Sequence, residues 1–253
     1  MRDKQTTSLS SPLTLGVLGG MGPQATVDFM HEIIARTPAR NDQEHIRVLV
    51  DSNPQAPDRQ AALKGDDTEL RRVLRDMALG LEARGADFLV LPCNTAHAFA
   101  DEAIAGVQVP WISIIDVTVE ATVQALTERS ASGKRVGLLA TDACIIANLY
   151  QRAAKRVDVD MRIPEATAQA ECMALIANVK RGDLSDDTRQ RMRTLANAFV
   201  EKEALDVLIA GCTEIPLVLQ SDDTAAVLIS STDALAGRSV DLALGRLPLP
   251  KTC

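Results

Sequence analysis

Aromatic residues are scarce in this chain of 253 residues: they make up 2% of it, with one tryptophan, one tyrosine and four phenylalanines. So few rings leave little with which to stack nucleic acid bases or to grip an aromatic ligand. A net charge of −7 also disfavours nucleic acid and anionic membranes as partners, because an acidic surface repels both. The core must therefore consist of Leu, Val, Ile and Ala, and any anionic ligand needs a local cationic pocket.

Cysteine usage points away from disulfides and metal sites. None of the five cysteines forms a CxxC pair or has zinc-ligand spacing, and an odd number cannot close a full set of disulfides. We therefore expect a reducing, cytoplasmic setting and no bound metal. A membrane span is not expected either, because Gly19, Gly20 and Pro23 interrupt the apolar stretch that follows the polar opening. Residues 1–12 are expected to form a flexible tail.

What the chain does have is an internal repeat. Its two halves resemble each other at an offset of about 120 residues, long enough for each copy to be a domain. Three pairs of segments match in the same order: TLGVLGGMG and RVGLLATDA, ADFLVLPCNT and LDVLIAGCTE, and VPWISIID and AVLISSTD. Each is a short apolar run that ends in glycine, polar or turn residues, and helical patterns such as 68–84 and 186–202 lie between them. This alternation predicts an α/β fold with parallel sheets.

The carboxyl ends of the predicted strands mark the expected ligand site, because open parallel sheets bind ligands there. These ends fall at residues 20–22, 93–95, 141–144 and 212–214. Two duplicated domains can present them to each other across a cleft. We assign residues 13–113 to the first domain and residues 114–224 to the second. The last matching segment lies near the C-terminus, so residues 225–248 are expected to complete the first domain with a returning strand and helix.

Cys93 and Cys212 occupy the same place in the two repeats. Each follows an aspartate, Asp87 or Asp206, by six residues and lies between a strand and an expected helix. A helix N-terminus lowers the pKa of a thiol from about 8.5 towards neutrality, which suits acid/base chemistry at cellular pH. If the domains face each other, a thiolate on one side removes a proton from a carbon stereocentre while a thiol on the other returns one. The alternative, two small core residues, leaves their repetition unexplained.

Polar groups beside the thiols and in the first loop are candidates for holding a ligand. The loop after the first strand offers backbone N–H groups to an anion, and its spacing is not GxGxxG, so a substrate carboxylate is favoured over a dinucleotide. The candidates that orient a carboxylate or ammonium, or alternatively cap helices, are Met21, Gly22, Asn94, Thr95, Thr213 and Glu214.

Several further residues have weaker claims. His97 lies four residues after Cys93 and can steady the preceding turn, or it is an ordinary hydrogen-bonded helix histidine. Thr141 and Cys144 lie in a strand-end loop and can touch substrate. Cys172 is assigned to helix packing and Cys253 to an exposed C-terminus.

Five motifs together resemble the aspartate/glutamate racemase family, and its aspartate racemase branch most closely. They are LGVLGGMGPQAT, TPARNDQEH, SNPQAPDR, GADFLVLPCNTAHAF and LIAGCTEIPLVL, within a resemblance that runs from residue 15 to about residue 244. It implies two Rossmann-like domains related by a pseudo-twofold axis, with the active site in the cleft between them. It also implies a homodimer, no pyridoxal phosphate and no metal, and one catalytic thiol from each domain, matching Cys93 and Cys212.

The same resemblance gives roles to two cations that the residues alone would leave as solvated surface charges. Arg59 follows Pro-Asp in SNPQAPDR, and Lys180 precedes Arg-Gly; both match positions that assist substrate binding in aspartate racemases. Asn53 of SNPQAPDR is a further candidate. Two cations beside two thiols suit a dicarboxylate, whose extra negative charge needs a partner.

One loop departs from the family pattern. Where the family has Ala-Thr-x-Gly-Thr, residues 140–144 read Ala-Thr-Asp-Ala-Cys, without the glycine and the second threonine. The predicted function is cofactor-independent interconversion of L- and D-aspartate, with glutamate or a broader range of amino acids as the alternative. A hydantoin racemase or maleate isomerase with similar paired cysteines, and a two-domain protein that only binds a small ligand, are the remaining alternatives.

Overall fold

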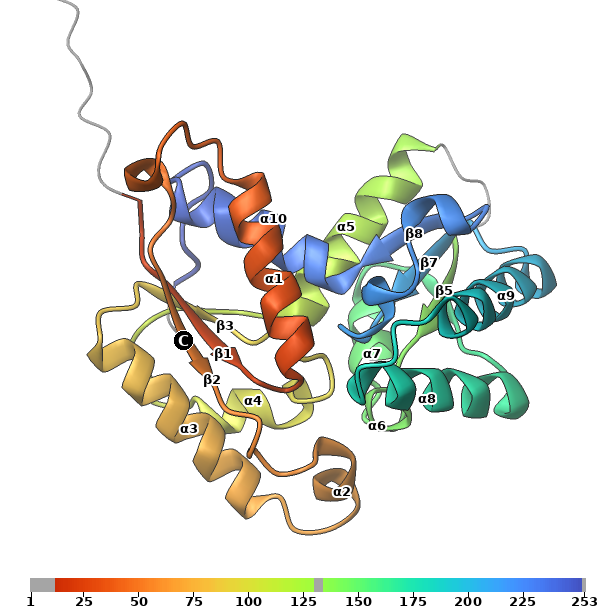
Figure 1. Ribbon diagram of the computed structural model, residues 1–253, viewed down its shortest axis with the longest axis horizontal. Helices are drawn as coiled ribbons and strands as arrows, with labels where there is room; N and C mark the ends of the chain where they lie inside the picture. The colour runs from red at the N-terminus through yellow and green to blue at the C-terminus, as the bar shows by residue number, and fades with distance from the viewer. Residues whose placement is uncertain (1–11, 130–133, 252–253) are drawn as a thin grey trace, which may run out of the picture.

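The computed structural model describes residues 12–129 and 134–251, in which strands and helices alternate as the repeat predicts (Figure 1). The predicted tail therefore lies outside the described residues apart from Pro12, and so does Cys253. Two four-stranded parallel sheets have the same order, β2-β1-β3-β4 and β6-β5-β7-β8. The strands are β1 (Leu15–Gly19), β2 (Val48–Ser52), β3 (Phe88–Val90), β4 (Trp111–Ile112), β5 (Arg135–Leu139), β6 (Asp160–Arg162), β7 (Val207–Ala210) and β8 (Val227–Ser230).

Helices cover both sheets. The α-helices are α1 (Pro23–Arg36), α2 (Arg59–Lys64), α3 (Thr68–Ala83), α4 (His97–Ala103), α5 (Ile114–Glu128), α6 (Asp142–Ile146), α7 (Leu149–Arg156), α8 (Ala166–Lys180), α9 (Asp186–Glu203) and α10 (Ser231–Ala243). Three 3-10 turns are η1 (Asp42–Glu44), η2 (Ile215–Leu217) and η3 (Ser221–Asp223). The helical patterns at 68–84 and 186–202 are confirmed by α3 and α9. The α/β class is confirmed, with two domains of matching topology.

The repeated aspartates explain part of the sequence similarity. A carboxylate oxygen of Asp87 accepts a hydrogen bond from the Thr14 backbone N–H at 2.6 Å. An oxygen of Asp206 accepts from the Arg135 N–H at 3.0 Å in the other half. Each aspartate lies at the start of the strand that leads to a cysteine and binds the start of the adjacent strand. This hydrogen bond fixes the alignment of the two strands.

Two helices are exchanged between the halves. Helix α5 follows β4 of the first sheet but packs against α7, β7 and β8, whereas α10 follows β8 and packs against α1. The two also pack against each other between the sheets (Figure 1). One buried apolar cluster accordingly contains Leu15 and Phe29 from the first half and Val136 and Tyr150 from the second. Because each large apolar side chain contributes roughly 1.5–3 kcal/mol when buried, this shared core holds the halves together.

The predicted return of residues 225–248 to the first domain is wrong for its strand. Strand β8 pairs in parallel with β7 and therefore belongs to the second sheet. Helix α10, in the same range, does pack against the first half through α1. The repeat held the signal that assigns this strand, because its segment matches that of β4, and both strands hold the fourth place in their sheets. The boundary at residue 224 is therefore wrong as well, whereas the boundary at residue 113 stays a prediction.

None of the helices in the described part of the chain is both long enough and apolar enough to cross a membrane.

Candidate active site

The two cysteines lie just beyond equivalent strands. Cys93 follows β3 by three residues and Cys212 follows β7 by two, and these strands hold the third place in their sheets. Their side chains are almost buried, with exposed fractions of 6% and 5%. Both line one cavity between the halves, which we call the inner cavity. The repeat thus brings two thiols from distant parts of the chain to one place.

The inner cavity also gathers most of the other candidates. Its lining is Met21, Asp58, Arg59, Gln60, Cys93, Asn94, Thr95, Thr141, Lys180, Cys212, Thr213 and Glu214. Asp58 and Gln60 were not predicted; Asp58 caps α2 by accepting hydrogen bonds from two backbone N–H groups, which places Arg59 at the first position of that helix. Lys180 is the last residue of α8. The two cations therefore enter the cavity from opposite halves.

The inner cavity is narrow. It leaves about 10 Å³ for a water-sized molecule, which is room for one water and not for a larger ligand. An outer cavity of about 170 Å³ adjoins it and shares Arg59, Lys180 and Glu214 with it. Gly22 lines this outer cavity rather than the inner one. The shared residues form the boundary that a ligand would cross.

Cys212 lies beside a buried carboxylate. Its Sγ donates a hydrogen bond to Oε2 of Glu214 at 3.0 Å, and Glu214 is only 3% exposed. Burial raises the pKa of the Cys212 thiol well above its ordinary value, and the charge of Glu214 raises it further while Lys180 opposes the rise. The chain after Cys212 forms only the 3-10 turn η2, not an α-helix. The predicted helix and lowered pKa are therefore wrong for this thiol.

Lys180 is a cation held among anionic groups. Burial lowers its pKa, but attraction to Glu214 and to the two cysteines as thiolates more than offsets this, with Arg59 opposing, so its pKa is raised. Lys180 therefore keeps its proton and supplies positive charge at the boundary of the two cavities.

The residues that follow Cys93 form hydrogen bonds with neutral side chains. Asn94 donates from Nδ2 to the Ser231 hydroxyl at 2.9 Å and accepts from the Tyr150 hydroxyl at 2.6 Å. The hydroxyls of Thr95 and Thr141 lie 2.8 Å apart and share a hydrogen bond across the two halves. Sequence reasoning missed Tyr150 and Ser231. The repeat offered a signal for Ser231: it directly follows Ser230, and Ser230 matches Ser113, which caps the helix after the equivalent strand of the first repeat.

Comparison with known proteins decides the family. The family model described as Asp/Glu/Hydantoin racemase matches residues 18–238. The chain belongs to the Asp/Glu/Hydantoin racemase family. This agrees with the resemblance carried by the five motifs.

Relatives of this racemase-family chain differ in substrate. A broad specificity amino-acid racemase from Bacillus subtilis is 28% identical over 232 residues, covering 89% of this chain and 96% of that protein. A glutamate racemase from Koribacter versatilis is 32% identical over 142 residues, covering 54% of this chain and 45% of that protein, so this match spans about half of its length. The structure of Picrophilus torridus aspartate racemase gives a TM-score of 0.79 at 26% identity, covering 94% of this chain and 96% of that one.

Three of the predicted site residues of this family member, Asn53, His97 and Cys144, lie outside both cavities. Asn53 accepts a hydrogen bond from the Gln55 N–H and so stabilises its own turn. Cys144 is fully buried in the shared core, where burial and the nearby Cys93 raise its pKa to about 12. It therefore does not reach a ligand in either cavity. Cys172 is buried in α8, as predicted.

His97 is a structural link in this racemase-family fold. Its Nε2 accepts a hydrogen bond from the Ile114 N–H at 3.1 Å, so the ring is neutral and Nδ1 donates to the Cys93 carbonyl at 2.9 Å. Burial is the main reason why its pKa is lowered from 6.5 to about 4. His97 thus ties the loop of Cys93 to the start of α5; the spacing of four residues predicted the contact with the Cys93 turn but not the link to α5.

The lowered pKa of His97 predicts a loss of stability in acid. A histidine that must stay neutral when folded stabilises the protein above its unfolded pKa of 6.5, and this contribution is lost as the pH falls towards 4. It amounts to roughly 3 kcal/mol over the whole range. Urea unfolding at pH 7 and pH 4.5 should therefore show that the free energy of unfolding falls more for the wild type than for His97→Gln. Equal drops would contradict this role.

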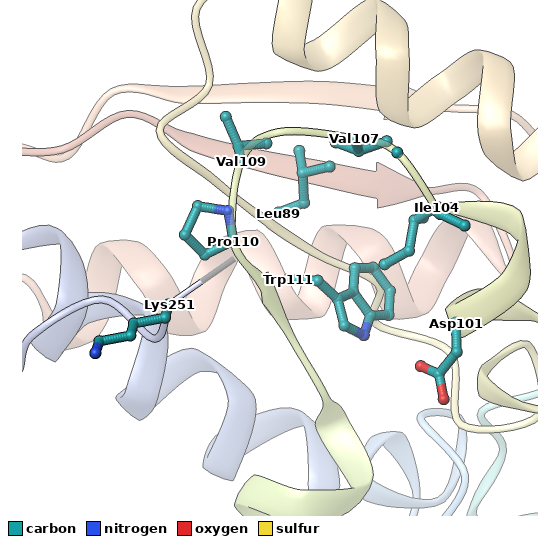
Figure 2. A pocket seen from close by; sticks show the side chains of 10 residues that line it. Leu89, Asp101, Ile104, Val107, Val109, Pro110, Trp111 and Lys251 are labelled. Carbon is teal, nitrogen blue, oxygen red and sulfur yellow. The ribbon is translucent and has the colours of Figure 1, made fainter. Parts of the chain in front are cut away.

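A separate hollow is lined in part by Trp111. It measures about 240 Å³ and is mainly apolar, with Leu89, Ile104, Val107, Val109 and Pro110 in its wall and Asp101 and Lys251 at its edges (Figure 2). It contains neither cysteine of the inner cavity.

The part of the chain that the structure describes contains no group of three or more His, Cys, Asp or Glu residues that could hold a metal ion.

Proposed function

We propose that the chain is a cofactor-independent racemase that interconverts L- and D-aspartate, with Cys93 and Cys212 as its two acid/base groups. The observation that carries this proposal is the meeting of two thiols from equivalent strand ends in one cavity. Membership of a racemase family supports the reaction type. The cations Arg59 and Lys180 in the same cavity support a substrate with two carboxylates.

The proposed reaction needs one proton to leave and one to arrive. One cysteine, as a thiolate, takes the proton from Cα and becomes a thiol, while the opposite thiol gives its proton to the other face and becomes a thiolate. The number of protons on the protein is unchanged. Pairing of the α-carboxylate with a cation makes the α-proton more acidic, because negative charge that develops at Cα is partly neutralised.

Glu214 offers a place for the substrate's ammonium group. Its Oε1 is buried and has no hydrogen-bond partner among the described residues, while Oε2 is occupied by the Cys212 thiol. A buried carboxylate oxygen without a donor is costly, and the ammonium of an amino acid would supply that donor. Gly22 keeps this oxygen accessible, because a Cβ there would lie 3.1 Å from it.

A broader substrate range is the second candidate. The loop at residues 140–144 lacks the hydroxyl that the family pattern has at its last position, and the cysteine there points into the core. A relative that is 28% identical is a broad specificity amino-acid racemase. Glutamate and small neutral amino acids are therefore the comparisons that matter.

The test is racemisation without any added cofactor. Purified protein is incubated with L- or D-aspartate, glutamate and alanine, and the enantiomers are separated by chiral chromatography. We expect inversion of aspartate in both directions, with kcat/KM at least about tenfold above that for the other two acids. Inversion of all three at similar rates would favour the broad racemase. Binding without inversion of any would overturn the racemase proposal and leave a ligand-binding protein.

We also propose a homodimer, as the family resemblance implies. Light scattering after gel filtration should give twice the 27.1 kDa of one chain; a mass of one chain would contradict it.

A further inference from the structure

The pseudo-twofold site is symmetric in its thiols but not in its charges. In the first repeat Cys93 is followed by Asn94 and Thr95, and in the second Cys212 is followed by Thr213 and Glu214. Thr95 and Glu214 therefore hold equivalent places. The Thr95 hydroxyl is bound to Thr141, whereas Glu214 accepts the Cys212 thiol at 3.0 Å. A carboxylate thus stands beside one thiol only.

This carboxylate affects the two protonation states of Cys212 differently. A thiol beside a carboxylate forms a charge-assisted hydrogen bond, whereas a thiolate at the same distance is repelled by it. Both groups are nearly buried, at 5% and 3% exposure, so water screens the repulsion poorly. Lys180 acts against this effect, and burial and Glu214 together outweigh it. Proton loss from Cys212 is therefore disfavoured in the empty site.

We infer that Glu214 is a positioning residue that keeps the proton on Cys212 in the resting enzyme, so that Cys93 acts as the first base. The inference deepens the proposed function and rests on it. In the first direction Cys93 takes the Cα proton and Cys212 gives its own. That turnover leaves Cys93 protonated and Cys212 as a thiolate beside Glu214. The enzyme must then return a proton to Cys212 before it processes the same enantiomer again.

The test measures cysteine reactivity without substrate. Wild type, Glu214→Gln and Glu214→Asp are alkylated with iodoacetamide between pH 6 and pH 10, and mass spectrometry follows Cys93 and Cys212 separately. The midpoint of each pH profile reports protonation, and its plateau reports access. Glu201→Gln, which removes an exposed carboxylate from α9, is the matched control.

We expect Cys212 of the wild type to react at higher pH than Cys93. Glu214→Gln should lower the midpoint of Cys212 by at least about one pH unit, the effect of removing a close like charge, and leave that of Cys93 in place. Glu214→Asp and Glu201→Gln should keep the midpoint of Cys212 nearer to that of the wild type. An unchanged midpoint in Glu214→Gln, or a change in its plateau alone, would overturn the inference.

This outcome is independent of the racemisation assay. If Glu214→Gln shifts the midpoint of Cys212 but the wild type inverts no amino acid, the proposed function is wrong and the effect of Glu214 on the thiol stands. If the wild type racemises an amino acid but Glu214→Gln leaves the midpoint of Cys212 unchanged, the proposed function stands and the inference about Glu214 is wrong.

Discussion

Replacing either Cys93 or Cys212 with alanine is expected to lower kcat for aspartate inversion by about 10²–10⁴-fold, the range that a positioned general acid or base contributes. Alanine has neither a proton to give nor a lone pair of suitable basicity, so one face of the substrate loses its partner. The double variant should be little worse than each single one, because both thiols serve the same step and their effects are not additive. Initial rates by chiral chromatography measure all three variants.

Cys172→Ala is the matched control for these variants. It removes a buried thiol from α8, which lies in the core of the second half and outside the inner cavity. Its kcat should stay within about twofold of the wild type, and circular dichroism should show that all four proteins are folded. Retention of inversion by Cys93→Ala or Cys212→Ala would mean that another group exchanges the proton.

Removal of either cation should lower kcat/KM for dicarboxylate substrates. Hydrogen bonds to charged groups contribute about 1.5–3 kcal/mol, so Lys180→Met and Arg59→Met should lower kcat/KM for aspartate by about 10–150-fold each. The α-carboxylate is common to all amino acids and the side-chain carboxylate is not. Replacing the cation that binds the side-chain carboxylate should therefore lower kcat/KM for aspartate but not for alanine.

The controls for the cations come from the same protein. Lys202→Met removes an exposed lysine that pairs with Glu165 on the surface of the second half, and it should leave kcat/KM unchanged. Lys180→Met also leaves Glu214 without its nearby positive charge, so its unfolding free energy must be measured beside its kinetics. Equal losses for aspartate and alanine in both variants would exclude a role in recognising the side-chain carboxylate.

Much of the fold followed from the sequence because the chain repeats itself. Two copies of an apolar strand that ends in a cysteine must place their carboxyl ends alike, and the structure brings Cys93 and Cys212 to one cavity. The helices at α3 and α9 follow from their apolar period. The sheet that β8 joins was assigned wrongly, although the match of its segment to that of β4 indicated the fourth place in the second sheet.

The surroundings of the thiols were less accessible to sequence reasoning. A position after a strand suggested a helix N-terminus at Cys212, but Pro216 and the short η2 turn replace it. Tyr150, the only tyrosine, comes from α7 and reaches Asn94 only because the halves pack together. The loop at residues 140–144 suggested that Cys144 faces substrate, whereas its side chain points into the core. Such contacts depend on tertiary distances that spacing does not encode.

The central claim is that two groups on opposite faces of the substrate exchange its α-proton, and isotope labelling during the first few per cent of conversion tests it most directly. L-aspartate is incubated with wild type in D2O, and mass spectrometry is applied to each separated enantiomer. We predict that the D-aspartate formed carries one deuterium at Cα, delivered by the exchanged thiol, while the remaining L-aspartate is still protonated. D-aspartate that retains the original proton, or deuterium that appears equally in both enantiomers from the start, would contradict the two-thiol mechanism and indicate a single base.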